Sequence, residues 1–245
     1  MQAAEIALLL LGGTVAGVVN TLAGGGSLLT VPLLLLLGLP GTEANGTNRI
    51  GTLLQSAVAA WRFRAEGVSM LREGARWSAP MLIGAGLGAL WVSRIPDATF
   101  ERSFAWLMLL LAVPTAWPRR ARPAAAPRAS GRGSALLLFA IGGYGGAFQA
   151  GVGIPLLAAL SRAGFDLVRA NAVKVVATTA LTATSVPFFV VAGQVRWGPA
   201  LVLGAGFSAG AALGARVAVR GGEGPIRAVL GIAVVALALK LLLGS

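Results

Sequence analysis

Residues 17–32 read Gly-Val-Val-Asn-Thr-Leu-Ala-Gly-Gly-Gly-Ser-Leu-Leu-Thr-Val-Pro and place three consecutive glycines between two apolar segments. Inside a helix each glycine costs up to about 1 kcal/mol relative to alanine, so Gly24, Gly25 and Gly26 are not there for helix stability. A break at this point would leave free backbone N–H groups where a helix begins near Ser27, and the helix dipole there favours an anion. The alternative is close helix packing through small residues, which we expect to explain most of the 35 glycines of the chain.

The chain around this stretch is too apolar for a soluble domain. Of its 245 residues, 56% are hydrophobic and 11% are charged, whereas soluble domains carry roughly 25% charged residues. Several apolar segments approach or exceed the roughly 20 residues that cross a bilayer as a helix. We therefore expect an all-α integral membrane protein, with a soluble all-helical core as the alternative. Irregular backbone at membrane depth is tolerated only where protein or a water-filled cavity covers it, so the glycine break is a candidate site.

The basic charge of the chain fits a membrane protein better than a nucleic-acid partner. The net charge is +12, and the arginines stand at the ends of apolar segments and not along one polar face. In membrane proteins such residues mark cytoplasmic loops. The absence of cysteine and histidine excludes disulfides, thiolate chemistry and imidazole-bound metals, and we expect no metal and no cofactor. The N-terminal Met-Gln-Ala-Ala-Glu lacks the basic region of a signal peptide, so we expect the first apolar stretch to remain in the mature protein.

The second half of the sequence echoes the first at a fixed offset of 126 residues. Ala44-Asn45 returns as Ala170-Asn171, and the Gly-Ala pair at 84–85 returns at 210–211. Two weakly similar membrane halves are typical of a transporter whose site lies near mid-membrane between them. We expect a first membrane repeat at 1–117, a basic cytoplasmic linker at 118–133 and a second membrane repeat at 134–245.

Each repeat is expected to contain a broken or re-entrant hairpin followed by three transmembrane helices. The broken elements are predicted at 5–38 and 134–161, the second interrupted around Gln149-Ala150-Gly151-Val152-Gly153. The full spans are predicted at 46–63, 76–93, 100–117, 171–192, 198–216 and 225–243.

The arginines favour an inverted arrangement of the two repeats. If each broken element returns to the side from which it entered, the arginine-rich loops at 62–76, 118–133, 161–170 and 216–227 all face the cytoplasm. If each broken element instead crosses the membrane, the loops of the second half after residue 161 change sides, and the arginines divide almost evenly between the two sides of the membrane. The positive-inside rule favours the first topology.

Two related motifs each open an apolar segment: Ala-Asn-Gly-Thr-Asn-Arg at 44–49 and Ala-Asn-Ala-Val-Lys at 170–174. Asn45 and Asn171 could be N-caps, typically worth about 1 kcal/mol. Lys174 would lie one turn inside its helix, where a lysine is costly unless it snorkels to the surface or faces a polar cavity. Helical spacing places two polar sets each on one face: Asn45, Asn48 and Thr52 in the first half, and Asn171, Lys174 and Thr178 in the second.

The available polar groups favour an anion over a cation. None of the eight Asp and Glu residues falls in the middle of a predicted span, whereas Asn, Thr, Ser, Gln, Lys and glycine backbone provide many donors. Without a buried carboxylate there is no obvious cation site or proton relay. Without a general base an enzyme is not expected.

These motifs resemble those of the TauE/SafE family of membrane permeases, also called sulfite exporters. The resemblance rests on residues 17–32 and 44–49 in the first half. In the second half it rests on Tyr-Gly-Gly-Ala-Phe-Gln-Ala-Gly-Val-Gly-Ile at 144–154, residues 169–174 and Leu-Gly-Ala-Arg at 213–216. It covers nearly the whole chain. It implies export of small sulfur-containing anions, such as sulfite and organosulfonates, from the bacterial cytoplasm, by a multi-pass protein of the inner membrane.

We therefore expect a secondary transporter that exports a small anion, with a site between the two glycine breaks. A carrier of an unrelated anion, or one working inward, is an alternative. Another is a non-transporting membrane partner of an enzyme complex, which predicts a packed centre without a cavity. Small-residue faces pack equally well within and between chains, so the chain could also form a homo-oligomer. The expected substrate-binding residues are Asn20, Thr21, Gly24, Gly25, Gly26, Ser27, Asn45, Asn48, Gln149, Gly151, Gly153, Asn171 and Lys174.

Overall fold

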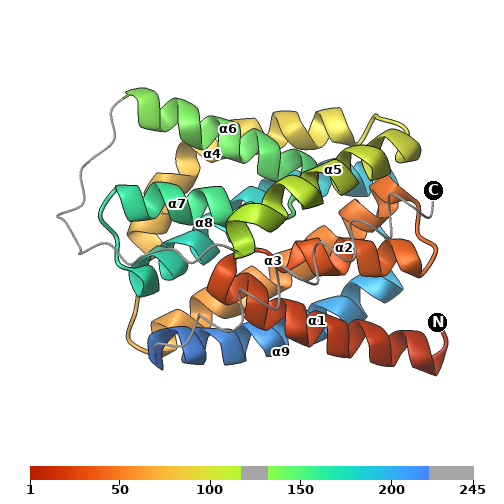
Figure 1. Ribbon diagram of the computed structural model, residues 1–245, viewed down its shortest axis with the longest axis horizontal. Helices are drawn as coiled ribbons and strands as arrows, with labels where there is room; N and C mark the ends of the chain where they lie inside the picture. Colours follow the sequence, from red (N-terminus) through yellow and green to blue (C-terminus); the bar gives the residue numbers. More distant parts are fainter. Residues whose placement is uncertain (117–131, 221–245) are drawn as a thin grey trace.

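The computed structural model of the protein describes residues 1–116 and 132–220, and all regular structure in these two ranges is helical (Figure 1). Most of the predicted linker at 118–133 and the predicted span at 225–243 lie outside the described residues. In the first half the helices are α1 (Ala3–Ala23), α2 (Ser27–Leu36), α3 (Gly41–Ala65), α4 (Leu71–Val92) and α5 (Asp97–Ala116). In the second half they are α6 (Arg132–Phe148), α7 (Gly153–Arg162), α8 (Leu167–Val191) and α9 (Trp197–Arg220).

Both predicted helix breaks are confirmed. The first apolar element stops at Ala23 and resumes at Ser27, and the second stops at Phe148 and resumes at Gly153. In each case the residue after the helix takes a left-handed backbone conformation, with a φ of +79° at Gly24. At the first break glycine adopts this conformation without the steric penalty of a Cβ. At the second break the residue is Gln149, with a φ of +60°.

The first full span after each broken element, α3 or α8, begins earlier than the predicted residues 46 and 171. In the first turn of α3, the backbone N–H and the hydroxyl of Thr42 both donate to Asp97 Oδ1, at 2.8 Å and 2.6 Å. In α8, Asp166 is the N-cap and accepts a hydrogen bond from a backbone N–H in the first turn. The N-cap interpretation of Asn45 and Asn171 is therefore wrong, because both lie inside helices that start before them.

Three helices in the described residues are long and apolar enough to cross a membrane: α1, α8 and α9. The third helix of the first half, α3, is 25 residues long but carries many polar residues. Those polar side chains, among them Asn45, Asn48 and Gln55, are buried against other helices. The protein is thus an all-α membrane protein in which a polar helix is shielded by apolar ones.

Helices are exchanged between the two halves. α1 of the first half packs along α9 of the second, and α6 of the second half packs along α4 of the first. Under the 126-residue offset these two pairs are equivalent, because α6 corresponds to α1 and α9 to α4. α3 and α8 lie between the pairs and contact each other and the exchanged helices.

Glycines allow the exchanged helices to approach to backbone contact. A Cβ added at Gly88 of α4 would lie 2.1 Å from the carbonyl oxygen of Gly143 in α6. A Cβ added at Gly17 of α1 would lie 2.2 Å from the carbonyl oxygen of Phe207 in α9. Small residues at helix contacts are the usual means of close packing in membranes. This part of the glycine content therefore serves packing, as the alternative interpretation of the sequence proposed.

The largest apolar cluster surrounds the first broken element. It combines buried side chains of α1 and α2 with phenylalanines of α5, α8 and α9. Phe100 stacks on both Phe104 and Phe148, with ring centroids 5.5 Å and 5.8 Å apart. The end of α6 is thereby fixed against α5, next to the second break.

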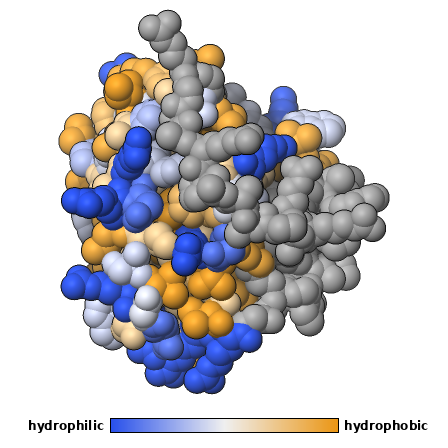
Figure 2. All heavy atoms as spheres, turned by 90° about the vertical axis from the view of Figure 1, so that its left-hand side faces the viewer, coloured by the Kyte–Doolittle hydropathy of each residue, from blue (hydrophilic) through white to orange (hydrophobic). Residues whose placement is uncertain are grey.

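The ends of the helices gather at two opposite ends of the molecule. At the left of Figure 1 lie the α3–α4 and α7–α8 connections, the start of α6 and the end of α9. At the right lie the start of α1 and the α2–α3, α4–α5 and α8–α9 connections. Figure 2 views the left-hand end and shows several hydrophilic clusters around an apolar surface.

Ion pairs also connect the two halves. Arg196, before α9, contacts Glu43 of α3 with its Nε 2.6 Å from Oε2, and this hydrogen bond raises the pKa of Arg196. Arg216 of α9 lies near Glu66, after α3, at 3.6 Å. Such exposed pairs typically contribute about 0–1 kcal/mol, so the halves are held mainly by helix packing.

Candidate functional site

The two helix breaks touch at the centre of the molecule. A Cβ added at Gly24 would lie 2.6 Å from Cα of Gly153, and a Cβ added at Gly153 would lie 2.5 Å from Cα of Gly24. Real Cβ atoms do not approach other atoms this closely, so the contact requires glycine on both sides. The features that were predicted separately in each half are therefore one junction in the tertiary structure.

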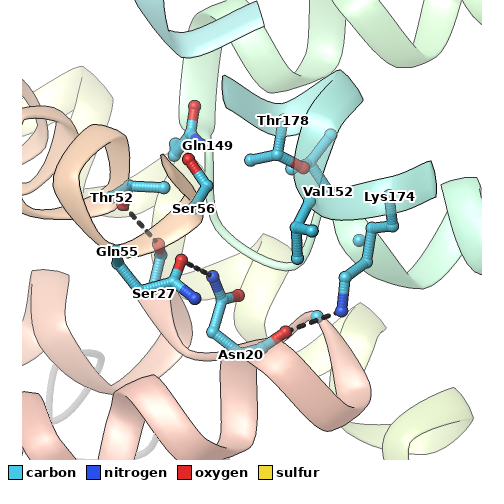
Figure 3. Close-up of a pocket in the computed structure, with 12 residues that line it drawn as sticks. Asn20, Ser27, Thr52, Gln55, Ser56, Gln149, Val152, Lys174 and Thr178 are labelled. Carbon is cyan, nitrogen blue, oxygen red and sulfur yellow. Dashed lines mark hydrogen bonds between the residues drawn. The ribbon is translucent and has the colours of Figure 1, made fainter. Parts of the chain in front are cut away.

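A small polar pocket with about 10 Å³ of free space, room for about one water molecule, lies beside this junction (Figure 3). Helices of both halves contribute to its lining. Six of the lining residues belong to the predicted site: Asn20, Gly24, Ser27, Gln149, Gly153 and Lys174. The other six were not in that set: Thr52, Gln55, Ser56, Val152, Val175 and Thr178.

The missed polar residues continue the polar helix faces read from the sequence. Thr52 and Thr178 were already placed on those faces. Gln55 follows Thr52 by three residues and so lies on the same face of α3, and it is fully buried. Extending the helical spacing by one more turn would have identified it.

Lys174 of α8 reaches across to the first half. Its side chain is 2% exposed, and Nζ lies 2.8 Å from the carbonyl oxygen of Asn20 and 2.7 Å from that of Thr21. Nζ also donates to Oδ1 of Asn171 at 2.7 Å. The two carbonyls belong to the last turn of α1, the negative end of the helix dipole. The snorkelling alternative for Lys174 is therefore wrong, and Figure 3 shows the side chain pointing from α8 to Asn20.

Arg49 of α3 makes the matching contact in the opposite direction. It is fully buried, and its guanidinium donates to the carbonyl oxygens of Gly145, Gly146 and Ala147 in the last turn of α6. The guanidinium carbon also lies 4.4 Å from the centre of the Phe189 ring. Arg49 was not in the predicted set, although its position next to Asn48, at the level of Lys174, was a usable signal.

Each broken helix thus ends on a cation from the other half. Lys174 of the second half binds the end of α1, and Arg49 of the first half binds the end of α6. A helix C-terminus carries the equivalent of about half a negative charge. The two cations offset these charges, so the centre does not repel an anion.

Side-chain amides extend the site from Lys174 into the cavity. Asn20 Nδ2 donates to Gln55 Oε1 at 2.7 Å, and Gln55 Nε2 donates to Thr21 Oγ1 at 3.0 Å. Asn20 Oδ1 accepts from the backbone N–H of Gly26 at 3.1 Å, which ties the glycine break to the end of α1. Ser27 at the start of α2 lies 3.4 Å from Thr52 through their hydroxyl oxygens.

The other predicted residues lie behind the lining or away from it. Thr21 and Asn171 hold Gln55 and Lys174 in place. Asn48 accepts a hydrogen bond from Thr30, and Asn45 donates to the carbonyl of Ala147 at 2.8 Å. The predicted residues outside the lining are Thr21, Gly25, Gly26, Asn45, Asn48, Gly151 and Asn171.

Gly151 faces apolar side chains and not the cavity. Its φ is +66°, and a Cβ at this position would lie 2.7 Å from the side chain of Leu111. We conclude that Gly151 is required for the turn between α6 and α7.

The residues that line the pocket include a cation but no acidic side chain. Lys174 is the one ionisable residue among the twelve, and none is Asp or Glu. In the part of the chain that the structure describes, no group of His, Cys, Asp or Glu could hold a metal ion. The lining offers amide and hydroxyl groups with one buried ammonium group, a set that suits an anion.

A multi-pass helical membrane protein with a polar site between two broken helices has the architecture of a membrane transporter. The chain belongs to the TauE/SafE family: residues 9–241 match the family described as "Sulfite exporter TauE/SafE". A bacterial inner-membrane location is consistent with its bacterial relatives.

Three relatives illustrate the similarity. The chain is 29% identical to the "Probable membrane transporter protein ORF9" of Sinorhizobium sp, over 97% of this chain and 92% of that protein. It is 31% identical to a "Probable membrane transporter protein" of Haemophilus influenzae, over 91% of this chain and 88% of the other. It is 27% identical to the "Probable membrane transporter protein YfcA" of Escherichia coli K12, over 94% and 87%. No solved structure matches the chain significantly.

Proposed function

We propose that the protein is a secondary transporter that exports a small oxyanion, sulfite or an organosulfonate, across the bacterial inner membrane. The observation that carries this proposal is the cavity between the halves, whose one ionisable lining residue is the cation Lys174. The family name supports sulfite as the first substrate to test. With no histidine or carboxylate in the lining to act as general base, we propose that the substrate is carried unchanged.

In this proposal the two broken helices form a movable junction. Gly24 and Gly153 provide backbone contact without side chains, so one half can rock against the other around the cavity. Lys174 stays bonded to the end of α1, and its charge attracts the anion. Rocking of two repeats around a fixed central site is the usual form of alternating access in such transporters.

The cavity also bears on the alternative of a non-transporting partner subunit. That interpretation predicted a centre in which the polar residues pair and no cavity remains. Many polar residues do pair across the halves, as Arg49 and Gln149 do. The pocket among them has about 10 Å³ of free space, room for about one water molecule, so the centre is nearly closed in this conformation. Transport is therefore favoured by the family and by the cationic lining, and not by the size of the pocket.

The transport proposal is tested by efflux of trapped sulfite from liposomes that contain the purified protein. We expect faster efflux than from protein-free liposomes. Sulfoacetate and unrelated small anions, tested in parallel, identify the substrate class. If sulfite, sulfoacetate and the other anions all stay inside, the export proposal is wrong and the partner-subunit interpretation gains weight.

We further propose that the two repeats are inverted in the membrane. The exchange of equivalent helices between the halves supports this topology. In Figure 1 the element α1–α2 starts and ends at the right, and α6–α7 starts and ends at the left. The α3–α4 and α7–α8 connections, each flanked by arginines in the adjoining helix ends, lie at the same end of the molecule, as the positive-inside rule requires of inverted repeats.

Cysteines introduced at Gly67 and Gly193 test the inversion. Both glycines are exposed with no atom within 4 Å of an added Cβ, and the chain has no other cysteine. They are equivalent under the repeat offset, so we expect an impermeant maleimide to label them from opposite sides of the membrane. Labelling of both from one side would refute the inverted topology.

A further inference from the structure

Gln149 has an unusual backbone conformation. Its φ is +60°, which makes it the one non-glycine residue with positive φ in the described parts of the chain. It follows the last residue of α6, as Gly24 with a φ of +79° follows the last residue of α1. For a residue with a Cβ this conformation costs roughly 1–2 kcal/mol. A strained residue in the lining of a cavity suggests that its side chain is needed there.

Both the oxygen and the nitrogen of the Gln149 side-chain amide form hydrogen bonds within the protein. Its Oε1 accepts a hydrogen bond from Arg49 Nη1 at 3.1 Å, and its Nε2 donates to Thr182 Oγ1 at 3.0 Å. A guanidinium group has donors only, so the end of the amide that faces Arg49 must be the oxygen. Arg49 therefore determines that the NH₂ end of Gln149 is turned away from it.

The side-chain amide of Gln55, in the first half, is oriented like that of Gln149: its oxygen accepts a hydrogen bond within the protein and its nitrogen donates to a threonine. Gln55 Oε1 accepts from Asn20 Nδ2, and Gln55 Nε2 donates to Thr21 Oγ1. Asn20 Oδ1 is in turn occupied by the N–H of Gly26, which fixes the NH₂ group of Asn20 towards Gln55. Both glutamines in the lining thus have their oxygens engaged within the protein. Each NH₂ group has two protons and gives one to a threonine, so the second can be donated to a ligand.

We propose that Gln149 is a specificity-determining residue and Arg49 its positioning residue. Because Arg49 binds Oε1 of Gln149, this acceptor is not available to a ligand, and the NH₂ group of the same amide is the part that can bind one. The site then selects ligands whose surface consists of acceptor oxygens, as in a deprotonated oxyanion. This inference rests on the proposed anion transport, and it names the residues that make the cavity selective.

The substitution Gln149→Glu separates the functional from the structural role. The new carboxylate is nearly isosteric and can still accept from Arg49 and from the hydroxyl of Thr182, so we expect an unchanged or higher melting temperature. It has no NH₂ group and adds a negative charge, so the KM for sulfite efflux is expected to rise at least about tenfold. An unchanged KM in this variant would overturn the inference.

Gln149→Gly is the matched control for the backbone. Glycine relieves the left-handed strain, so the melting temperature should stay within a few degrees of wild type while the KM rises as in Gln149→Glu. If the melting temperature falls sharply and the KM is unchanged, Gln149 has only a structural role.

Arg49 is tested by comparing Arg49→Lys with Arg49→Gln. Lysine has donors only and should preserve the orientation of Gln149, so its KM stays within about threefold of wild type even if the protein is less stable. Glutamine can present either end of its amide, so its KM should rise about tenfold. If both variants lose stability and maximal rate with the same KM, Arg49 is not a positioning residue. Should Arg49→Gln fail to fold, the two Gln149 variants decide.

A binding measurement distinguishes failure of this inference from failure of the transport proposal. Sulfite is titrated against each variant in detergent, and the rise in melting temperature reports binding without transport. Wild-type protein that binds sulfite but does not carry it contradicts the transport proposal, while the Gln149 variants still test selectivity. Wild-type protein that neither binds nor carries any of the anions contradicts both.

Discussion

Lys174→Met is expected to abolish sulfite efflux and to destabilise the protein by about 1–3 kcal/mol, because a buried acceptor that loses its hydrogen bond costs about that much. Methionine has a similar volume but no donor, so the carbonyls of Asn20 and Thr21 and Oδ1 of Asn171 each lose the hydrogen bond from Nζ. The C-terminus of α1, the negative end of its dipole, would then face the cavity without a compensating positive charge. Efflux from liposomes and the melting temperature in detergent measure the two effects.

Arg94→Met is the control for this substitution. It also removes one positive charge, but Arg94 is exposed in the turn between α4 and α5. Exposed substitutions of this kind usually change stability by less than about 0.5 kcal/mol. We expect unchanged efflux and stability. Normal efflux in Lys174→Met, with an unchanged melting temperature, would show that Lys174 neither attracts the anion nor holds α1.

Gly88→Ala is expected to prevent correct packing of α4 against α6. The new methyl group would lie 2.1 Å from the carbonyl oxygen of Gly143, and a backbone atom cannot move aside as a flexible side chain can. Overpacking typically costs 1–3 kcal/mol, so for a clash with backbone we expect a loss of about 3 kcal/mol or more. Thermal unfolding monitored by size-exclusion chromatography in detergent measures it.

Gly86→Ala provides a control on the same helix. A Cβ at Gly86 would meet the ring of Phe188 at 3.8 Å and the methyl group of Thr184 at 4.0 Å, both ordinary contacts. Alanine is the better helix former by up to about 1 kcal/mol, so this variant should be as stable as wild type or more stable. Equal stability of the Gly88 and Gly86 variants would contradict the close contact between α4 and α6.

The repeat extends this prediction to both halves. A Cβ at Gly84 would lie 2.1 Å from the carbonyl oxygen of Phe139, and one at its equivalent Gly210 would lie 2.0 Å from that of Thr14. Alanine should therefore destabilise the protein to a similar degree at both positions.

From the sequence we correctly predicted features that depend only on residues adjacent in the chain. The glycines at 24–26 and the Gln-Ala-Gly-Val stretch at 149–152 end their helices because the backbone conformation needed there is local. Helix starts were predicted less well, because the first turn of α3 is held by Asp97 from the start of α5. Asp166 as the N-cap of α8 was a local signal that could have been read from the sequence.

The role of the buried cations could not be predicted in the same way. For Lys174 the sequence left both snorkelling and a polar cavity open, since both place a lysine one turn inside a helix. Its acceptors at the end of α1 lie more than 150 residues away in the chain. The carbonyls that bind Arg49 are almost 100 residues from it. Nothing in the local sequence indicates such partners.

The sequence by itself thus determined the membrane class, the two helix breaks, the polar faces of the central helices and the family. These depend on composition, on helical spacing and on motifs, all of which are properties of short segments. Only the tertiary structure decided that the breaks touch, that each broken helix ends on a cation from the other half and that Arg49 orients Gln149. The physical reason is that a buried charge or amide is stable only with hydrogen-bond partners, and here those partners come from the opposite half of the chain.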